Sequence, residues 1–106
     1  MKILFDQGAP VPLRSYLLHH KVETAYENRW SNLENGDLLT KAEAAGFDAF
    51  VTTDQNLRYQ QNLVGRKISI VVLLTTSWPR IRNHAALVVQ AIDKVSAGSY
   101  QEISFP

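Results

Sequence analysis

The amino-acid sequence predicts an α/β fold built on a mainly parallel, roughly five-stranded sheet with helices on both faces. Short apolar runs alternate with longer amphipathic segments, and the 106 residues contain no repeat and no shift in composition. The segment KISIVVLL is the most β-branched of the chain, which is typical of a parallel strand buried on both faces. Since the length is that of one ordinary domain, we expect a single domain over residues 1–106.

The N-terminal half predicts two strands, each followed by a helix. The apolar run Lys2–Phe5 is the first strand, and Pro12 suits the first turn of the helix after it. His20–Tyr26 alternates apolar and polar residues like a second strand and leads into a polar loop. Asn35 can cap the next helix, which is expected at Gly36–Ala45.

The C-terminal half continues the alternation. Phe47–Thr52 is the third expected strand, and a polar helix at about Asn56–Leu63 separates it from the β-branched strand. The longest expected helix begins at Trp78 and ends before Gly98, because its apolar residues recur at helical spacing throughout. A last short strand is expected at Tyr100–Phe105.

Three aspartates form the only group of residues with chemical content. Asp6 ends the first expected strand, Asp54 ends the third, and Asp37 lies in the first turn of the helix between them. Ligands of such sheets gather beyond the carboxyl ends of the strands, so all three can reach one edge. Crowded carboxylates repel one another and need a cation, and Mg²⁺ or Mn²⁺ favours oxygen ligands. Such an ion can orient water and stabilise the leaving oxygen in phosphodiester hydrolysis.

Each aspartate also has a purely structural interpretation. Asp6 and Asp54 can cap the helices that follow them. Asp37 can interact favourably with the dipole of its own helix and pair with Lys41 one turn later. Among the strand-end hydroxyls, Thr53 is the one expected to assist beside Asp54. Spacing alone does not decide between these interpretations and a metal site.

Three segments resemble the small bacterial PIN-like proteins, a branch of the PIN-domain nuclease superfamily: KILFDQGAP, WSNLENGDLLTKAEAAGFDAF and VTTDQNL. The resemblance covers about the first two thirds of the chain. In it, Asp6 aligns with the first metal-binding aspartate, Asp37 with the acidic residue near the second helix, and Asp54 with the aspartate of the T-x-D segment. It implies a three-layer α/β/α sandwich, catalytic metal ligands at these aspartates, cleavage of RNA and, because many relatives resemble toxins, an antitoxin protein as partner.

Three positions depart from the pattern of these relatives. Gln7, Asn35 and Asn56 stand where relatives often carry a further acid. Fewer carboxylates weaken the attraction for a second cation, so we expect one metal ion or a weakly active site. Gln7 and Asn56 can still offer amide groups, and Arg58 can contact phosphate, so these residues and Thr53 are the expected supporting group.

Two other functions stay open at this stage. A receiver-type phosphoacceptor domain also places aspartates at strand ends and uses Mg²⁺, but it needs an acid pair after the first strand and a lysine closing the last, which this chain lacks. A metal-poor binding or oligomer module, for instance a homodimer, would explain the missing acids. It also fits the net charge of +1, which gives long RNA little nonspecific attraction.

The composition of the chain and its apolar runs predict the cellular compartment of the protein. The apolar run at the N-terminus is too short for a signal peptide, and no stretch reaches the ~18 apolar residues that a membrane span needs. The chain has no cysteine, which excludes disulfides and thiolate chemistry. We therefore expect a cytoplasmic protein without membrane contact, and the resemblance to the PIN-like proteins implies a bacterial one.

Overall fold

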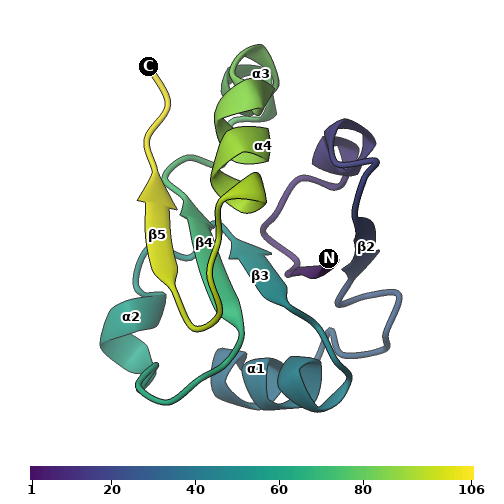
Figure 1. The fold of residues 1–106 in the computed structure, drawn as a ribbon, viewed down its shortest axis with the longest axis vertical. Helices are drawn as coiled ribbons and strands as arrows, with labels where there is room; N and C mark the ends of the chain where they lie inside the picture. The colour runs from purple at the N-terminus through teal and green to yellow at the C-terminus, as the bar shows by residue number, and fades with distance from the viewer.

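The computed structural model describes residues 1–106 and has one sheet of five strands in the order β2-β1-β3-β4-β5. The strands are β1 (Lys2–Phe5), β2 (Lys21–Thr24), β3 (Ala49–Thr52), β4 (Ser69–Leu73) and β5 (Tyr100–Ile103). All four pairings are parallel, and Figure 1 shows β3, β4 and β5 side by side with their arrowheads toward the same end. The predicted fold class, an α/β protein with a five-stranded parallel sheet, is confirmed.

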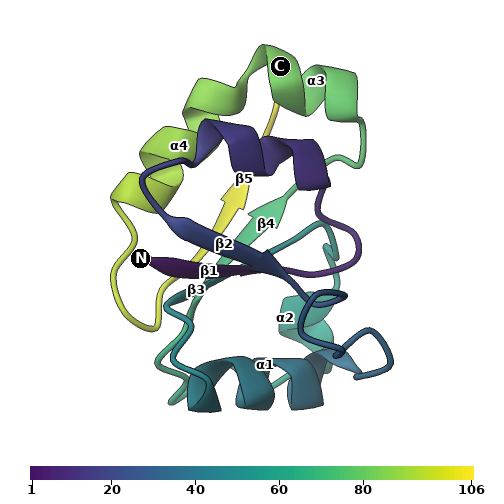
Figure 2. The same cartoon turned by 90° about the vertical axis from the view of Figure 1, so that its right-hand side faces the viewer.

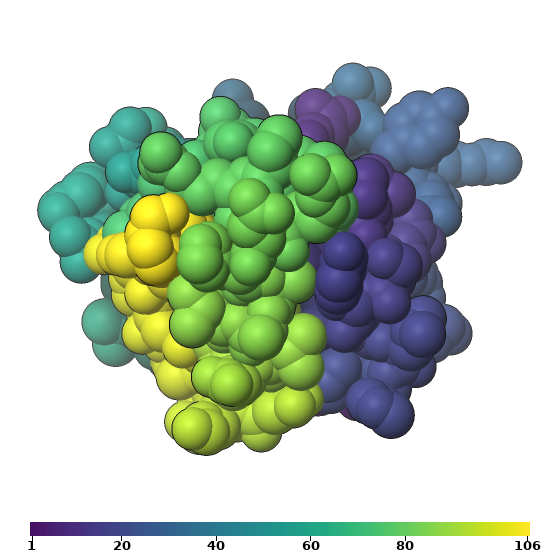
Figure 3. Space-filling model, turned by 90° about the horizontal axis from the view of Figure 1, so that it is seen from above, coloured from purple at the N-terminus to yellow at the C-terminus, as the bar shows by residue number.

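Helices cover both faces of the sheet. They are the 3₁₀ helix η1 (Val11–Tyr16), α1 (Asn35–Ala44), α2 (Leu57–Gln60), α3 (Trp78–Asn83) and α4 (Ala85–Asp93). In Figure 2 the sheet lies in the middle, with η1, α3 and α4 above it and α1 and α2 below. Seen from above in Figure 3, α3 and α4 (green) lie between the C-terminal segment (yellow) and the N-terminal part of the chain (purple and dark blue). No helix is long and apolar enough to cross a membrane.

Alternation along the strands divides the core into two layers. On β1, Ile3 and Phe5 pack into the cluster that includes residues of η1, α3 and α4. Leu4, between them, packs into the other cluster with residues of α1 and α2. Successive side chains of a strand point to opposite faces, so a strand covered on both sides must be apolar at every position. The burial of all five residues of β4 follows from this and makes the fold a three-layer α/β/α sandwich.

The prediction of a single helix from Trp78 to Gly98 is wrong, because the helix is interrupted at His84. The backbone of His84 has φ −128° and ψ 31°, outside the helical region, and it ends α3 and begins α4. Ile81 in α3 and Val88 in α4 are nevertheless both fully buried in the same cluster. The apolar spacing therefore predicted which side chains are buried, although it carried no signal for the change of helix axis.

Other expected elements are shorter in the structure, and the predicted N-terminal cap of α1 is wrong. The expected helix after Pro12 is a 3₁₀ helix, and the expected helix at Asn56–Leu63 has only four residues, Leu57–Gln60. Asn35 does not cap α1, which begins at Asn35 itself after Glu34 without any side-chain cap. The Asn35 side chain instead donates to Asp54 at the carboxyl edge of the sheet.

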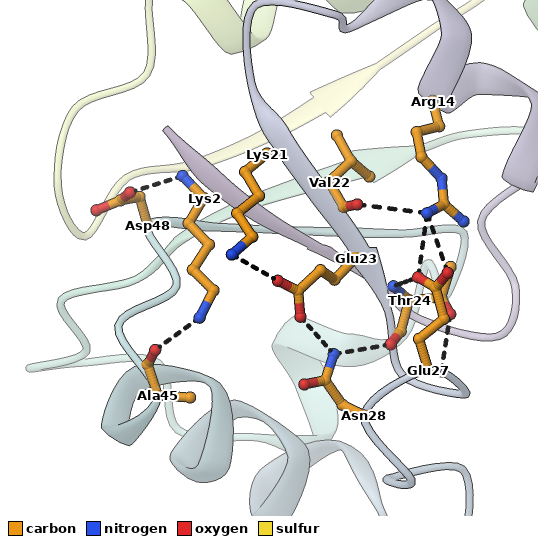
Figure 4. A network of polar contacts seen from close by, with 10 residues as sticks. All are labelled: Lys2, Arg14, Lys21, Val22, Glu23, Thr24, Glu27, Asn28, Ala45 and Asp48. Carbon is orange, nitrogen blue, oxygen red and sulfur yellow. Dashed lines mark hydrogen bonds and ion pairs between the residues drawn. The ribbon is translucent and has the colours of Figure 1, made fainter.

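A polar network fixes the turn at the end of β2 (Figure 4). Glu27 accepts a hydrogen bond from the backbone N–H of Thr24 at 2.9 Å and two from Arg14 at 3.1 Å. In return the backbone N–H of Glu27 donates to the Thr24 hydroxyl at 3.0 Å. The Thr24 N–H and the Arg14 guanidinium hold the pKa of Glu27 below its ordinary value of 4.5.

We expect Glu27→Gln to lower the free energy of unfolding at neutral pH. Because the pKa of Glu27 is lower in the folded protein than in the unfolded chain, its stabilisation is complete above pH 4.5 and is lost as the pH falls through the folded value. Urea unfolding at a series of pH values should therefore show the gap between wild type and Glu27→Gln closing below pH 4.5. Glu34→Gln is the control, since Glu34 is exposed and forms no side-chain hydrogen bond; a gap that stays constant with pH would contradict the account.

Candidate functional site

The strand order places a crevice between β1 and β3. The chain places β2 next to one edge of β1 and later places β3, β4 and β5 beyond its other edge. The direction in which strands are added therefore reverses between β1 and β3. Crevices at such reversals, beyond the carboxyl ends of the strands, are where open α/β sheets bind ligands. Asp6 directly follows β1, and Asp54 follows β3 by two residues.

The hydroxyl of Thr52 joins the two aspartates. Phe5 is in register with Val51, and the N–H of Asp6 donates to the carbonyl of Val51 at 3.1 Å, so Asp6 is the neighbour of Thr52 across the two strands. The Thr52 hydroxyl donates to Oδ2 of Asp6 and accepts the backbone N–H of Asp54 at 3.0 Å. Thr52 is fully buried, so its one hydroxyl holds both acidic residues in a fixed relation.

The loop after β1 closes around the Asp6 carboxylate. Oδ1 of Asp6 accepts hydrogen bonds from the backbone N–H groups of Gly8 at 2.9 Å and Ala9 at 3.0 Å. Gly8 also lies against Thr53, whose hydroxyl donates to the Gly8 carbonyl at 3.2 Å. A Cβ on residue 8 would collide with the Thr53 hydroxyl oxygen, so this close approach requires glycine. Thr53 therefore secures the Asp6 loop, and its hydroxyl is hydrogen-bonded to Gly8 instead of Asp54.

Asp54 is held by two different segments. Its Oδ1 accepts the backbone N–H of Asn56 at 2.9 Å, in the turn that opens α2. Its Oδ2 accepts the side-chain amide of Asn35 at 2.8 Å, from the first residue of α1. Asn35 is thus the residue of α1 that reaches the site, and Asn56 contributes its backbone.

The remaining expected site residues lie differently. Asp37 is exposed on α1 and forms no hydrogen bond or ion pair, and the structure contains no group of three or more acidic, histidine or cysteine side chains able to hold a metal ion. Of the three expected aspartates, the structure links Asp6 and Asp54 through Thr52 and shows no contact of Asp37 with either. Gln7 donates to the carbonyl of Ser31 at 3.2 Å, in the loop between β2 and α1. Arg58 contacts Tyr59 and the β5 residues Tyr100 and Glu102 instead of the aspartates.

The electrostatics of the pair favour one cation. Burial raises the pKa of Asp6; the hydrogen bonds from Thr52, Ala9 and Gly8 oppose this rise, and the charge of Asp54 adds to it. Each carboxylate offers about four lone-pair positions. Asp6 accepts three hydrogen bonds and Asp54 accepts two, so the pair keeps about three free positions. This donor set fits a Mg²⁺- or Mn²⁺-type ion, which uses one or two carboxylates and keeps several waters.

A cavity opens beside Asp6. It has a volume of about 190 Å³, and its polar wall is made by Asp6, Gln7, Ser31 and Asn35. Its apolar wall includes Trp30, whose ring packs edge-on against Phe47 at 6.0 Å between centroids, so the wall is fixed to the core. The cavity is large enough to admit several waters.

Sequence reasoning missed the roles of Thr52 and Asn35. A signal for Thr52 was present in the T-x-D spacing, because a threonine hydroxyl often accepts the N–H two residues later. For Asn35 no local signal exists: asparagine before a helix is ordinarily a cap, and its actual partner is nineteen positions away in sequence.

Comparison with known proteins gave no match: no family model, no curated protein and no solved structure matches the chain. The resemblance to PIN-like proteins therefore stays a prediction from the sequence motifs. What the site can do is argued below from its own geometry.

We expect Thr52→Val to lower the free energy of unfolding by about 2 kcal/mol, because Val keeps the shape of Thr but leaves Asp6 Oδ2 and the Asp54 N–H without their partner. Thr52→Ser keeps the hydroxyl and should cost only about 1 kcal/mol for the missing methyl group. Urea unfolding in metal-free buffer measures both. Equal stability of Thr52→Val and wild type would show that the hydroxyl does not organise the pair.

Proposed function

We propose that the protein is a divalent-metal-dependent ribonuclease of PIN-like type, which hydrolyses RNA phosphodiesters at Asp6 and Asp54. The observation that carries the proposal is the linked pair of carboxylates at the reversal point of the sheet, joined by the buried Thr52 hydroxyl, with a cavity that Asp6 lines. The motifs around these aspartates support RNA as the substrate class, and the charge on the pair supports a bound Mg²⁺ or Mn²⁺.

Each residue of the proposed site has a separate role. Asp6 and Asp54 hold the ion, and when bound the ion supplies Lewis-acid polarisation of the phosphodiester and an activated water. Asn35 donates to Oδ2 of Asp54 and keeps this carboxylate in place. Gln7 lies at the cavity wall, where its amide can orient a phosphate oxygen. Asp37, exposed and without contacts, has no part in holding the ion.

The biological setting proposed with this activity is that of a cytoplasmic toxin held in check by an antitoxin protein. The PIN-like motifs of the first two thirds of the chain support it. A reading frame for a small DNA-binding protein beside the coding sequence would support the pairing directly.

Cleavage assays with the purified protein test the proposal. We expect wild type to cut a labelled single-stranded RNA when Mn²⁺ or Mg²⁺ is present and to stop when EDTA removes the ion. Asp6→Asn and Asp54→Asn should each lower the rate by about a hundredfold or more, because each removes a charged ligand of the ion. Circular dichroism should show that Asp6→Asn stays folded, since Asn keeps the size of Asp and one acceptor oxygen for the N–H groups of Gly8 and Ala9.

Asp37→Asn is the matched control for these variants, because it removes the same charge from an exposed position nearby. Its rate should equal that of wild type. Loss of cleavage in Asp37→Asn, or unchanged cleavage in Asp54→Asn, would contradict the two-aspartate site.

The strand order also favours a second candidate, a receiver-type phosphoacceptor domain. The order β2-β1-β3-β4-β5 is that of the doubly wound receiver fold, and in it Asp54 lies after the third strand. Against it, a single acid follows β1, and no lysine follows β5 in the closing residues of the chain. Incubation with a small phosphodonor, followed by measurement of the intact mass, separates the two candidates, because a phosphoacceptor gains one phosphoryl group and a nuclease does not.

A further inference from the structure

Three neighbouring cavities share wall residues, and two of them are lined by Asp6. The cavity at the aspartate pair has Asp6 and Gln7 in common with a second cavity of about 490 Å³. The second shares Tyr26 and Glu27 with a third of about 450 Å³, and the third returns to Ser31 at the first. Arg14 lines the second, and Arg29 and Asn32 line the third. We name this surface the Tyr26 groove.

The segment that carries the groove is held in one conformation. The backbone N–H of Arg29 donates to the carbonyl of Tyr26 at 3.0 Å, and that of Trp30 donates to Ala25 at 2.9 Å. Arg29 has φ 62°, in the left-handed region that residues other than glycine seldom adopt. In Figure 3 the blue segment after β2 stands out from the body of the molecule at the upper right. The segment therefore presents its exposed side chains from one defined backbone conformation.

Tyr26 presents an aromatic face to the groove. Its side chain is 79% exposed, and neither its ring nor its hydroxyl has a partner in the protein. The two tryptophans differ, because Trp30 packs on Phe47 and Trp78 packs on Tyr16. An exposed, unpartnered aromatic ring on a rigid turn is a surface on which a planar ring of a ligand can stack.

The charges of the groove suit a phosphate backbone. Arg14 and Glu27 neutralise each other at 3.1 Å, as Figure 4 shows for this wall. Arg29 is exposed and has no ion pair or hydrogen bond at its side chain, so its charge is free for a ligand. With the cation proposed at Asp6 and Asp54, the groove would carry one positive centre in the cavity lined by Asp6 and a second, Arg29, in the third cavity, which Tyr26 also lines.

We propose that the Tyr26 groove binds a single strand of RNA and leads it to the aspartate pair, with Tyr26 stacking on an unpaired base and Arg29 contacting a backbone phosphate. This rests on the proposed function and adds the strand-binding residues to it. A duplex is excluded from this contact, because its bases are already stacked and paired and offer no face to Tyr26. Tyr26 and Arg29 are positioning residues and do not touch the phosphodiester that is cut.

Binding is measured by fluorescence anisotropy of a short labelled oligoribonucleotide with non-hydrolysable linkages, with the full chain in Mn²⁺, so that the proposed cation is present and no strand is cut. We expect Tyr26→Ala to raise Kd about tenfold, as loss of one base–aromatic stack does, and Tyr26→Phe to leave Kd unchanged. Tyr59→Ala is the matched control, since Tyr59 is also exposed, at 72%, but lies on α2 and lines none of the three cavities.

Arg29→Gly tests the phosphate contact. Glycine adopts φ 62° without strain, so this variant should fold at least as stably as wild type, and weaker binding cannot be ascribed to unfolding. We expect the dependence of log Kd on log salt to become shallower by about 0.7, the value for one phosphate contact on a single strand. Arg80→Gln, which removes an exposed arginine of α3 outside the groove, should leave the slope unchanged.

The outcomes separate the groove from the nuclease. Binding that depends on Tyr26 but not Tyr59, with no cleavage in Mn²⁺, supports the groove and contradicts the nuclease. Normal cleavage with equal binding by wild type and Tyr26→Ala contradicts the groove and leaves the nuclease intact. The groove assignment also fails if wild type binds no RNA, as for a protein or peptide ligand, or if a duplex of the same sequence binds as tightly and loses as much on Tyr26→Ala.

Discussion

The hydroxyl of Thr52 is the interaction on which the site depends. Parallel pairing of β1 with β3 brings Asp6 beside Thr52, and the hydroxyl then donates to Asp6 and accepts from the N–H of Asp54. Because Thr52 is fully buried, water cannot replace either hydrogen bond. Two carboxylates that come from separate strands are therefore set in one geometry by the sheet, before any ligand arrives, as a preorganised site requires.

This arrangement has an energetic cost that stability alone does not explain. Burial and the nearby charge of Asp54 both oppose ionisation of Asp6, and the hydrogen bonds of its loop only partly compensate. A fold selected for stability alone would replace such a pair by neutral or apolar residues. A divalent ion removes the repulsion between the two carboxylates and occupies their free acceptor positions. Binding of the ion therefore recovers the free energy that the pair costs the folded protein. The surrounding segments hold the two carboxylates in place for the ion: Gly8 permits the close turn at Asp6, and Asn35 anchors Asp54.

Much of the fold could be predicted from the sequence, because burial on two faces leaves a plain pattern. The apolar runs at β1 and β4 predicted their strands, and the apolar spacing from Trp78 onward predicted the face of α3 and α4 that packs on the sheet. The break at His84 could not be predicted, since both helices keep the same apolar face. In the site, strand ends predicted the places of Asp6 and Asp54. The replacement of Asp37 by Asn35 depends on how α1 docks against β3, a tertiary contact that local spacing does not report.

Calorimetric titration of Mn²⁺ into the metal-free protein tests the central claim most directly, because it measures the pair as a cation site without requiring any substrate. The account predicts one ion for each chain, with binding lost in Asp54→Asn and retained in Asp37→Asn. Absence of binding to wild type, or binding that survives in Asp54→Asn, would contradict it.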